Sequence, residues 1–265
     1  MSASIYPWTE DMLSPLGEQG IVIRCGDVVS EEVHHRVMSV CALLEKLENR
    51  SLTALVEWVP SYLSVTLFYD PLRSSYEKTC GLLLQLLRPS NQLHQQPQSS
   101  ECSQLGKSED LKPGEPGGAL APSRIVTIPV CYGGAFGPDL EHVAEENHLT
   151  MEEVITIHTS ADYLVHMIGF APGFPYLGGL PERIATPRRA TPRLRVEAGT
   201  VGIGGSQTGI YPVISPGGWQ CIGRTPVRLF RPEENPPSLL GAGDIVRFQS
   251  ITMQEYMEQA QKGGE

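Results

Sequence analysis

The sequence lacks an excess of basic residues. It has 20 lysines and arginines against 30 aspartates and glutamates among 265 residues, which gives a net charge of −10 at pH 7. A protein that binds nucleic acid in general needs a basic stripe to attract the phosphates, so this charge balance excludes that class. We therefore expect no nucleic acid among the partners of this chain.

Long apolar runs and metal-ligand motifs are also missing. No stretch approaches the roughly 18 apolar residues of a membrane span, and the first residues, MSASIYPWTEDML, lack a basic start followed by an apolar segment. The six cysteines form no C-x-x-C pair, and the seven histidines form no H-E-x-x-H motif. We expect a cytoplasmic protein with reduced thiols, no membrane partner and no bound metal.

The residues that are present predict an α+β protein that begins with a small α/β domain over residues 1–89. Branched residues at 20–24 predict a strand, Ser30 caps a helix whose apolar residues recur at helical spacing up to Leu47, and 55–59 and 62–69 form a hairpin. A second amphipathic helix covers 76–87. With the strand over 124–131 as a candidate to complete the sheet, the order βαββαβ predicts a ferredoxin-like arrangement with both helices on one face.

Residues 90–123 interrupt this pattern with a segment rich in Gln, Ser, Pro and Gly. Such a composition lacks the apolar residues that a packed core needs, so we predict a flexible insertion. Its Gly106-Lys107-Ser108 resembles the end of a phosphate-binding P-loop, but Glu101 occupies the position of the earlier glycine and no strand precedes it. We therefore do not interpret this tripeptide as a phosphate site.

The remaining residues, 124–265, predict a β-barrel that includes short helices. Pro138 is suited to the first turn of a helix, and Thr150 with Glu153 forms a capping box that opens a second helix. Apolar residues over 163–170 predict a central strand, and 227–230 and 245–248 predict further short strands. Many short strands separated by turns indicate a closed or nearly closed barrel. The residues from 253 to 265 predict a frayed terminal helix.

The run from Gly169 to Trp219 is dense in glycine and proline and is our candidate functional face. Its segment GTVGIGGSQTG is not a dinucleotide fingerprint, because Gln207 occupies the third glycine position and no helical pattern follows. The segment has two interpretations. Its backbone N–H groups, with the side chains of Gln207 and Thr208, converge on a phosphate or carboxylate. Alternatively, the glycines permit the sharp bends of a barrel turn.

Titratable side chains near this run are candidates for catalysis. Arginines recur in a proline-punctuated loop, and Arg224 follows a second glycine cluster, so guanidinium groups are available for an acidic ligand. Solvent-exposed or carbonyl-capping arginines are the alternative. His166, within an apolar strand, is either a general acid or base or a hydrogen-bonded core residue. The arginines of the loop are Arg188, Arg189, Arg193 and Arg195.

Aromatic and small residues of the same run are predicted to line a pocket or a partner-facing groove. Aromatic packing in the core accounts for the aromatic residues equally well. Ser215 lacks the G-x-S-x-G elbow of serine hydrolases, so that class is remote. The candidate pocket or interface residues are Phe170, Pro172, Phe174, Tyr176, Ser215, Gly217, Gly218 and Trp219.

Several motifs together resemble one known family. The runs GFAPGFPYLGGL, AGTVGIGGSQTGIYP, SPGGWQCIGRTP and GAGDIVRF, with two PR dipeptides after the first, are similar to those of the PxpB/KipI family. Its members are B-type subunits of ATP-dependent 5-oxoprolinase and are related to part of the carboxyltransferase region of urea carboxylase. YGGAFGPDLEHVA and HTSADYLV extend the resemblance over most of the chain outside 90–122. The family implies a small α/β domain followed by a cyclophilin-like β-barrel.

The resemblance implies a subunit of a complex that converts 5-oxoproline to glutamate with ATP and Mg²⁺, together with a C-type and an A-type subunit. The isolated chain is then expected to be inactive. With this function in view, Arg224 and Arg188 are the candidates for neutralising charge, and His166 of the apolar strand is the third predicted catalytic residue. Two alternatives share the motifs: a KipI-like inhibitor of sensor histidine kinase autophosphorylation, and a urea carboxylase-like carboxyltransferase component. The implied substrate- or phosphate-binding residues are Gly202, Gly204, Gly205, Gln207, Thr208 and Tyr211.

Overall fold

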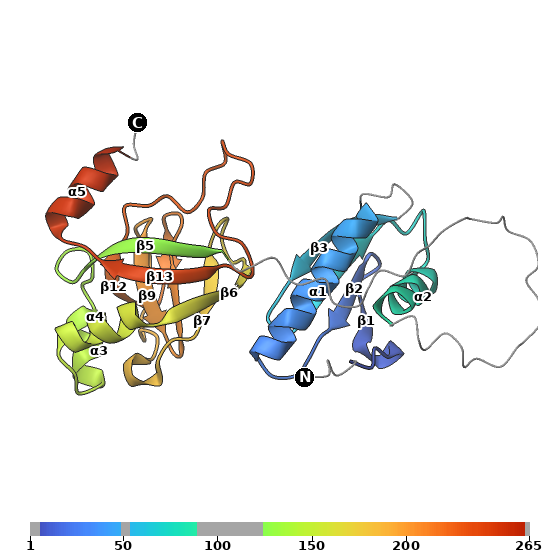
Figure 1. The fold of residues 1–265 in the computed structure, drawn as a ribbon, viewed down its shortest axis with the longest axis horizontal. Coiled ribbons are helices and arrows are strands. Elements are labelled where there is room, and N and C mark those ends of the chain that lie inside the picture. Colours follow the sequence, from blue (N-terminus) through green and yellow to red (C-terminus); the bar gives the residue numbers. More distant parts are fainter. Residues whose placement is uncertain (1–5, 49–53, 89–123, 263–265) are drawn as a thin grey trace, which may run out of the picture. The chain divides into compact units, whose positions relative to one another are not determined.

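The computed structural model of the chain describes residues 6–48, 54–88 and 124–262 (Figure 1). The contacts between Cα atoms divide the chain into two compact units, Met1–Pro122 and Ser123–Glu265. The insertion predicted over 90–123 lies outside the described residues. No helix within the described ranges is long and apolar enough to cross a membrane.

The N-terminal unit is a four-stranded antiparallel sheet with two helices. The predicted helices are present, and both pack on one face of the sheet, because Ile21 and Ile23 of the second strand share a buried cluster with Val37 and Leu83 from the two helices. The elements are the 3₁₀ turn η1 (Glu10–Met12), β1 (Leu13–Leu16), β2 (Gly20–Arg24), α1 (Glu31–Glu48), β3 (Leu55–Pro60), β4 (Ser64–Tyr69) and α2 (Tyr76–Leu87).

The strand order of this sheet corrects the predicted βαββαβ arrangement. The sheet runs β1-β2-β4-β3, so the edge position beside β2 belongs to β1, which precedes β2 along the chain. The strand expected over 124–131 is instead β5 (Ile125–Tyr132), which belongs to the second unit. Pro15 hid β1 from the sequence pattern, but a proline without an N–H is tolerated in an edge strand. Gly17, with φ of 60°, makes the turn between β1 and β2.

The second unit is a closed β-barrel of mixed strand direction. Within residues 124–262, its strand order is β10-β7-β6-β13-β5-β12-β9, and β9 pairs with β10 to close it. The pair β13–β5 is parallel, and the other neighbours are antiparallel. This confirms the predicted barrel. Besides β5, its strands are β6 (Asp162–Ile168), β7 (Pro175–Gly178), β9 (Thr200–Gly204), β10 (Gln207–Ile210), β12 (Gln220–Arg224) and β13 (Ile245–Ser250).

Short helices and one outer hairpin complete this unit. The predicted capping box is present, because Thr150 Oγ1 accepts from the Glu153 N–H while the Glu153 side chain accepts from the Thr150 N–H. Pro138 lies one residue before Asp139, the N-cap of the preceding helix. The additional elements are α3 (Leu140–Glu146), α4 (Met151–Ser160), the 3₁₀ turn η3 (Glu182–Ile184), the antiparallel pair β8 (Arg193–Val196) and β11 (Ser215–Gly217), and α5 (Met253–Lys262).

The strand predicted over 227–230 is wrong. This segment forms a single isolated bridge between Phe230 and Ser238. Prolines at 226, 232, 236 and 237 surround it, and each removes a backbone N–H that a ladder needs. Leu229 is nevertheless buried, so its apolar character comes from core packing rather than from a strand.

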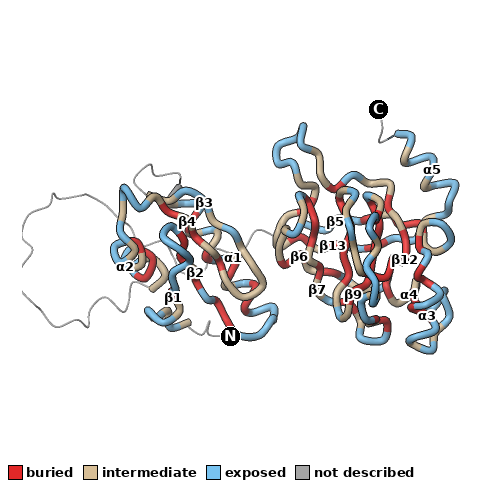
Figure 2. Tube along the Cα trace, turned by 180° about the vertical axis from the view of Figure 1, so that it is seen from behind, coloured by how far each residue is buried: buried red, intermediate tan, exposed pale blue. Residues whose placement is uncertain are grey.

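Each unit has its own hydrophobic core. In the tube of Figure 2, buried segments follow the strands of the sheet in one unit and of the barrel in the other. The barrel interior is filled by large apolar side chains such as Ile128, Tyr163, Leu177, Ile203 and Ile222, which are fully buried. The barrel is therefore a packed scaffold, and space for a ligand is found on its outside.

Candidate functional site

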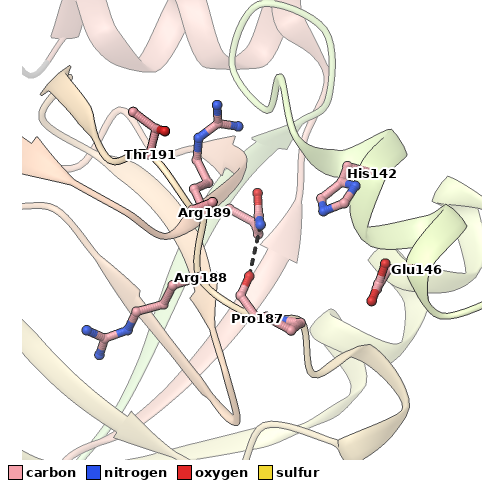
Figure 3. A pocket seen from close by; sticks show the side chains of 8 residues that line it. His142, Glu146, Pro187, Arg188, Arg189 and Thr191 are labelled. Atoms are coloured by element: carbon pink, nitrogen blue, oxygen red, sulfur yellow. Dashed lines mark hydrogen bonds between the residues drawn. The ribbon is translucent and has the colours of Figure 1, made fainter.

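A pocket of about 400 Å³ lies on the outside of the barrel, between α3 and the loop that leads into β8 (Figure 3). Two residues four apart on α3 face it from one side, and the loop over 187–191 faces it from the other. Gln220, the first residue of β12, contributes a buried side chain. The lining residues are His142, Glu146, Pro187, Arg188, Arg189, Ala190, Thr191 and Gln220.

Gln220 has one satisfied and one unsatisfied end. Its side-chain Nε2 donates to the carbonyl oxygen of Pro187 at 2.9 Å, the hydrogen bond that the dashed line in Figure 3 marks. This bond fixes the orientation of the amide, because only the nitrogen can donate. The other end, Oε1, is buried and accepts no hydrogen bond from any residue that the structure describes. Gln220 is only 3% exposed, so this acceptor lies directly behind the pocket wall.

A buried carboxylate holds the arginine side of the pocket in place. Asp139, whose side chain is 6% exposed, accepts from Arg189 Nη1 at 3.0 Å and from both terminal nitrogens of Arg193 at 2.7 Å. Its Oδ2 also accepts from the backbone N–H of Cys221 at 2.7 Å. Burial opposes ionisation of Asp139, but the Arg193 and Cys221 hydrogen bonds and the charges of Arg193 and Arg189 keep its pKa below 3.8.

Arg189 therefore has a guanidinium that Asp139 holds at Nη1. While Nη1 pairs with Asp139, the Nε–H is buried and has no acceptor among the described residues. The sequence placed Arg189 among four loop arginines without singling it out. No sequence pattern singles out Asp139 or Gln220 as a site residue, although both lie within the motifs that carry the family resemblance.

The two predicted catalytic arginines have different surroundings. Arg188 is exposed, lines the pocket, and lies with its guanidinium carbon 5.7 Å from the centroid of the Trp219 ring. Arg224, at the end of β12, does not line the pocket; its guanidinium carbon lies 5.5 Å from the centroid of Phe136, and its side chain neighbours Tyr256. Arg188 thus belongs to the pocket rim, although its side chain points away from His142 and Glu146 (Figure 3), and Arg224 lies outside the pocket.

The glycines predicted to cradle a phosphate form a strand and its hairpin. A methyl group added at Gly204 would lie 2.5 Å from Nε1 of Trp219, and one at Gly202 would lie 3.2 Å from the Trp219 Cβ. Both glycines thus make room for the indole. Gly205, with φ of 69°, begins the two-residue turn from β9 to β10, and its N–H donates to Thr186 O at 2.8 Å. These contacts favour the alternative interpretation, a barrel turn.

Thr208 points into a buried hydrogen-bond chain. Its hydroxyl donates to Gly202 O at 3.0 Å, so His158 Nε2–H, also at 3.0 Å, must be the donor to Thr208 Oγ1. His158 Nδ1 then accepts from the Tyr132 hydroxyl at 2.8 Å. The hydroxyl of Thr208 is therefore used inside the barrel. Gln207 begins β10 and is half-buried; its binding role stays a prediction.

His166 and His158 are the two buried histidines of the barrel. His166, the predicted catalytic residue, packs against the backbone of Gly178, where an added methyl group would lie 2.3 Å from its Nε2. Burial lowers the pKa of His166. It also lowers the pKa of His158, from 6.5 to about 3. Both environments favour a neutral imidazole, and neither histidine lines the pocket.

The predicted aromatic residues come together in one cluster. The ring of Phe174 lies at its centre, edge-on to Phe170, Tyr176, Tyr211 and Trp219 at centroid distances of 5.2–5.7 Å. Such packing fits the core alternative for most of these rings. The other predicted pocket residues lie in different surroundings. Pro172 is exposed and Ser215 is half-buried. Gly217 makes room for the Tyr211 hydroxyl, and Gly218 lies beside Pro192.

Phe170 differs from the rest of the cluster. Its side chain is 67% exposed, and its backbone has φ of 67°, a conformation that favours glycine. The strand predicted over 163–170 is shorter than expected at this end, because β6 ends at Ile168, before Phe170. An exposed aromatic ring is consistent with the predicted pocket or interface role, which stays a prediction.

Comparisons with known proteins cover nearly all of this chain. Residues 12–240 match the family model described as carboxyltransferase domain, subdomain C and D. The chain is 43% identical over 244 residues to the B-type subunit of 5-oxoprolinase from Bacillus subtilis (strain 168), covering 92% of this chain and 94% of that protein. It is 58% identical over 131 residues to the corresponding 5-oxoprolinase subunit of Escherichia coli O157:H7, covering 49% and 60%, respectively. The crystal structure of TTHA0988 is similar with a TM-score of 0.67 and 35% identity, covering 88% of this chain and 40% of that chain.

Proposed function

Because the chain belongs to the family of the carboxyltransferase domain, subdomain C and D, we propose that it is the B-type subunit of an ATP-dependent 5-oxoprolinase. One observation carries this proposal: the 43% identity to a protein of that name extends over 92% of this chain and 94% of the relative. An alignment of that extent includes both structural units and every residue of the pocket. The reaction is the opening of the lactam ring of 5-oxoproline to give glutamate.

The chemistry explains why such a reaction uses ATP. A five-membered lactam resists hydrolysis, and coupling to ATP through a phosphorylated intermediate makes the ring opening favourable. Phosphoryl transfer depends chiefly on positioning and on neutralising the charge of the phosphates. We propose that this chain acts with a C-type and an A-type subunit and is inactive alone.

The glycine segment does not fit a nucleotide site. The N–H of Gly205 donates to Thr186, and β9 lies between β10 and β12, so the glycine segment serves the barrel ladder. Residues 6–48, 54–88 and 124–262 contain no group of three or more His, Cys, Asp or Glu side chains that could hold a metal ion. We therefore place ATP and Mg²⁺ on another subunit and assign this chain to binding the lactam.

Reconstitution tests the proposed function. The full chain, combined with C-type and A-type subunits, should form glutamate from 5-oxoproline in a reaction that requires ATP, and omission of this chain should abolish it. Equal activity without the chain would contradict the proposal. A requirement for biotin would instead favour the carboxyltransferase alternative, and inhibition of a sensor histidine kinase by the isolated chain would favour the KipI-like one.

The same assay tests the predicted role of Arg224. If its guanidinium neutralises developing charge, Arg224→Ala should lower kcat by about 10²-fold or more, the scale of a lost electrostatic contact in a transition state. Arg228→Ala is a matched control, because Arg228 is exposed and pairs with Glu233 at 2.9 Å. Unchanged glutamate formation in Arg224→Ala would remove this residue from the site.

A further inference from the structure

Two polar atoms without partners lie behind the same pocket wall. Gln220 Oε1 is an acceptor and Arg189 Nε–H is a donor, and neither has a hydrogen-bond partner among the described residues. Buried polar groups are paired in the great majority of cases, so two exceptions in residues that line one pocket call for a ligand that supplies both partners. Such a ligand must offer an N–H or O–H beside an acceptor oxygen.

Both atoms are held in position by contacts that a ligand need not disturb. The carbonyl of Pro187 fixes the amide of Gln220 at 2.9 Å. The carboxylate of Asp139 fixes the guanidinium of Arg189 at 3.0 Å, and Arg193 with the Cys221 N–H fixes that carboxylate in turn. A site whose groups are already oriented loses little conformational freedom when it binds.

A cyclic amide has the matching arrangement of groups. A peptide bond is almost always trans, which places its N–H and C=O on opposite sides. The ring of a lactam forces the amide to be cis, so that the N–H and C=O lie side by side on one edge. That edge offers a donor for Gln220 Oε1 and an acceptor for Arg189 Nε–H. A pocket of about 400 Å³ has room for a small lactam with a carboxylate.

We propose that this pocket is the lactam-recognition site, in which Gln220 Oε1 accepts the ring N–H of 5-oxoproline and Arg189 Nε–H donates to the ring carbonyl. The inference rests on the proposed function and assigns its substrate to a place on this chain. Arg188, exposed at the rim with its guanidinium beside Trp219, turns toward the pocket to pair with the substrate carboxylate. The rim residues 187, 188, 190 and 191 are exposed, so their side chains can move aside to admit the ring while the Pro187 carbonyl and the Arg189 guanidinium stay in place.

The contact from Arg189 also suits the reaction. A donor aimed at the lactam oxygen stabilises the negative charge that develops there when the carbonyl carbon is attacked. Since Asp139 keeps Arg189 in place without contacting the ligand, it is a positioning residue. The geometry thus separates recognition of the amide edge, by Gln220 and Arg189, from recognition of the carboxylate, by Arg188.

The test compares substrate analogues in the reconstituted complex. The lactone analogue, in which a ring oxygen replaces the N–H, and N-methyl-5-oxoproline both lack the donor for Gln220. The wild-type complex is assayed with labelled 5-oxoproline, and each analogue is added as a competitor. The inhibition constant of each analogue should be about tenfold or more above that of unlabelled 5-oxoproline. In Gln220→Met, KM for 5-oxoproline should rise about tenfold or more, and the preference for lactam over lactone should largely vanish.

Two further variants separate recognition from structure. Gln249→Met changes an exposed glutamine of the same barrel and should leave KM and the analogue preference unchanged. Arg189→Lys keeps the charge beside Asp139 but removes the Nε–H, and it should lower kcat more than it raises KM. If Gln220→Met fails to fold, as judged by its thermal transition, the wild-type analogue series and Arg189→Lys still decide the question.

Failure of the inference is distinct from failure of the proposed function. If the wild-type complex forms glutamate while Gln220→Met behaves like Gln249→Met, or lactone competes as well as lactam, the pocket assignment is overturned and the function stands. The two atoms then bind ordered water only. If the complex forms no glutamate, titration of the full chain with 5-oxoproline, followed by NMR, decides: saturable binding that Gln220→Met weakens supports the pocket, and no binding overturns it.

Discussion

Asp139 is the residue on which the geometry of the pocket depends. Its side chain is 6% exposed and accepts hydrogen bonds from two arginines and from one backbone N–H. We expect Asp139→Asn to lower the free energy of unfolding by about 2–4 kcal/mol, less than for a fully buried pair because the arginines are partly exposed. Urea unfolding measures this loss. Asp162→Asn is the control, since the Asp162–Arg247 pair is about half exposed and should contribute less than about 1 kcal/mol.

The pH dependence of the same residue has a defined sign. The pKa of Asp139 in the folded state lies below its ordinary 3.8, so its stabilising effect is fully present above that value and is lost as pH falls through the lowered pKa. The difference in stability between wild type and Asp139→Asn should therefore stay constant from pH 7 to about 4 and shrink below it. A difference that shrinks already between pH 7 and 5 would contradict this assignment.

His158 gives the barrel a different pH response. Its Nδ1 must accept from Tyr132 while its Nε2–H donates to Thr208, so the chain needs a neutral ring. Its pKa is about 3 in the folded state and 6.5 ordinarily, so the unfolded state takes up the proton first. Below pH 6.5, each pH unit should cost up to about 1.4 kcal/mol of stability, until about pH 3.

Unfolding free energies of wild type and His158→Gln between pH 7 and 4 test this expectation. The glutamine does not titrate, so the curve of the variant should fall less steeply than that of the wild type. Parallel curves would mean that His158 takes up its proton as readily in the folded barrel as in the unfolded chain.

At the scale of elements, the hairpin β9–β10 depends on the glycines beneath Trp219. We expect Gly204→Ala to destabilise the barrel by about 1–3 kcal/mol, because the new methyl group meets the indole at 2.5 Å and forces the ring to move. Gly81→Ala is the matched control, since Gly81 lies within α2 with nothing within 4 Å of the added methyl group. That change should stabilise by about 0.5–1 kcal/mol. Thermal or urea unfolding measures both, and equal effects would contradict the packing role.

Elements were predictable where one local signal decides them. The capping box of Thr150 and Glu153 defined the start of α4, and the spacing of apolar residues defined α1 and α2. The signal failed where a proline competed with it. Pro15 hid an edge strand, and the apolar residues over 227–230 are buried without a ladder. The sheet to which β5 belongs was not predictable either, because strand pairing across the chain leaves no local pattern.

In the candidate site, too, local sequence patterns predicted some features, and others depend on contacts that only the fold creates. The sequence drew attention to the glycine-rich run, and its aromatic residues do cluster, but the glycines serve Trp219 and the hairpin. Gln220 and Asp139 had no distinguishing pattern, since a glutamine in a strand and an aspartate at an N-cap are ordinary. Their importance depends on contacts with Pro187 and Arg189 that only the fold creates.

For the whole molecule, the two units should fold separately. The sheet and the barrel have separate buried clusters. We expect a fragment of residues 124–265 to unfold cooperatively and to give a dispersed NMR spectrum. The matched control is residues 124–244, which lacks β13, the strand between β5 and β6. That fragment should not unfold cooperatively. A barrel fragment that is unfolded without residues 1–123 would show that the units depend on each other.

The position of β13 also sets the order in which the barrel can be completed during synthesis. β5 is the first barrel strand to leave the ribosome and β13 is the last, yet they are paired along six residues. Until residues 245–250 have emerged, β5 and β6 each have an unpaired edge, and such edges recruit other chains. The nascent barrel therefore keeps these two strand edges unpaired until its last strand is made, and β13 then pairs with both.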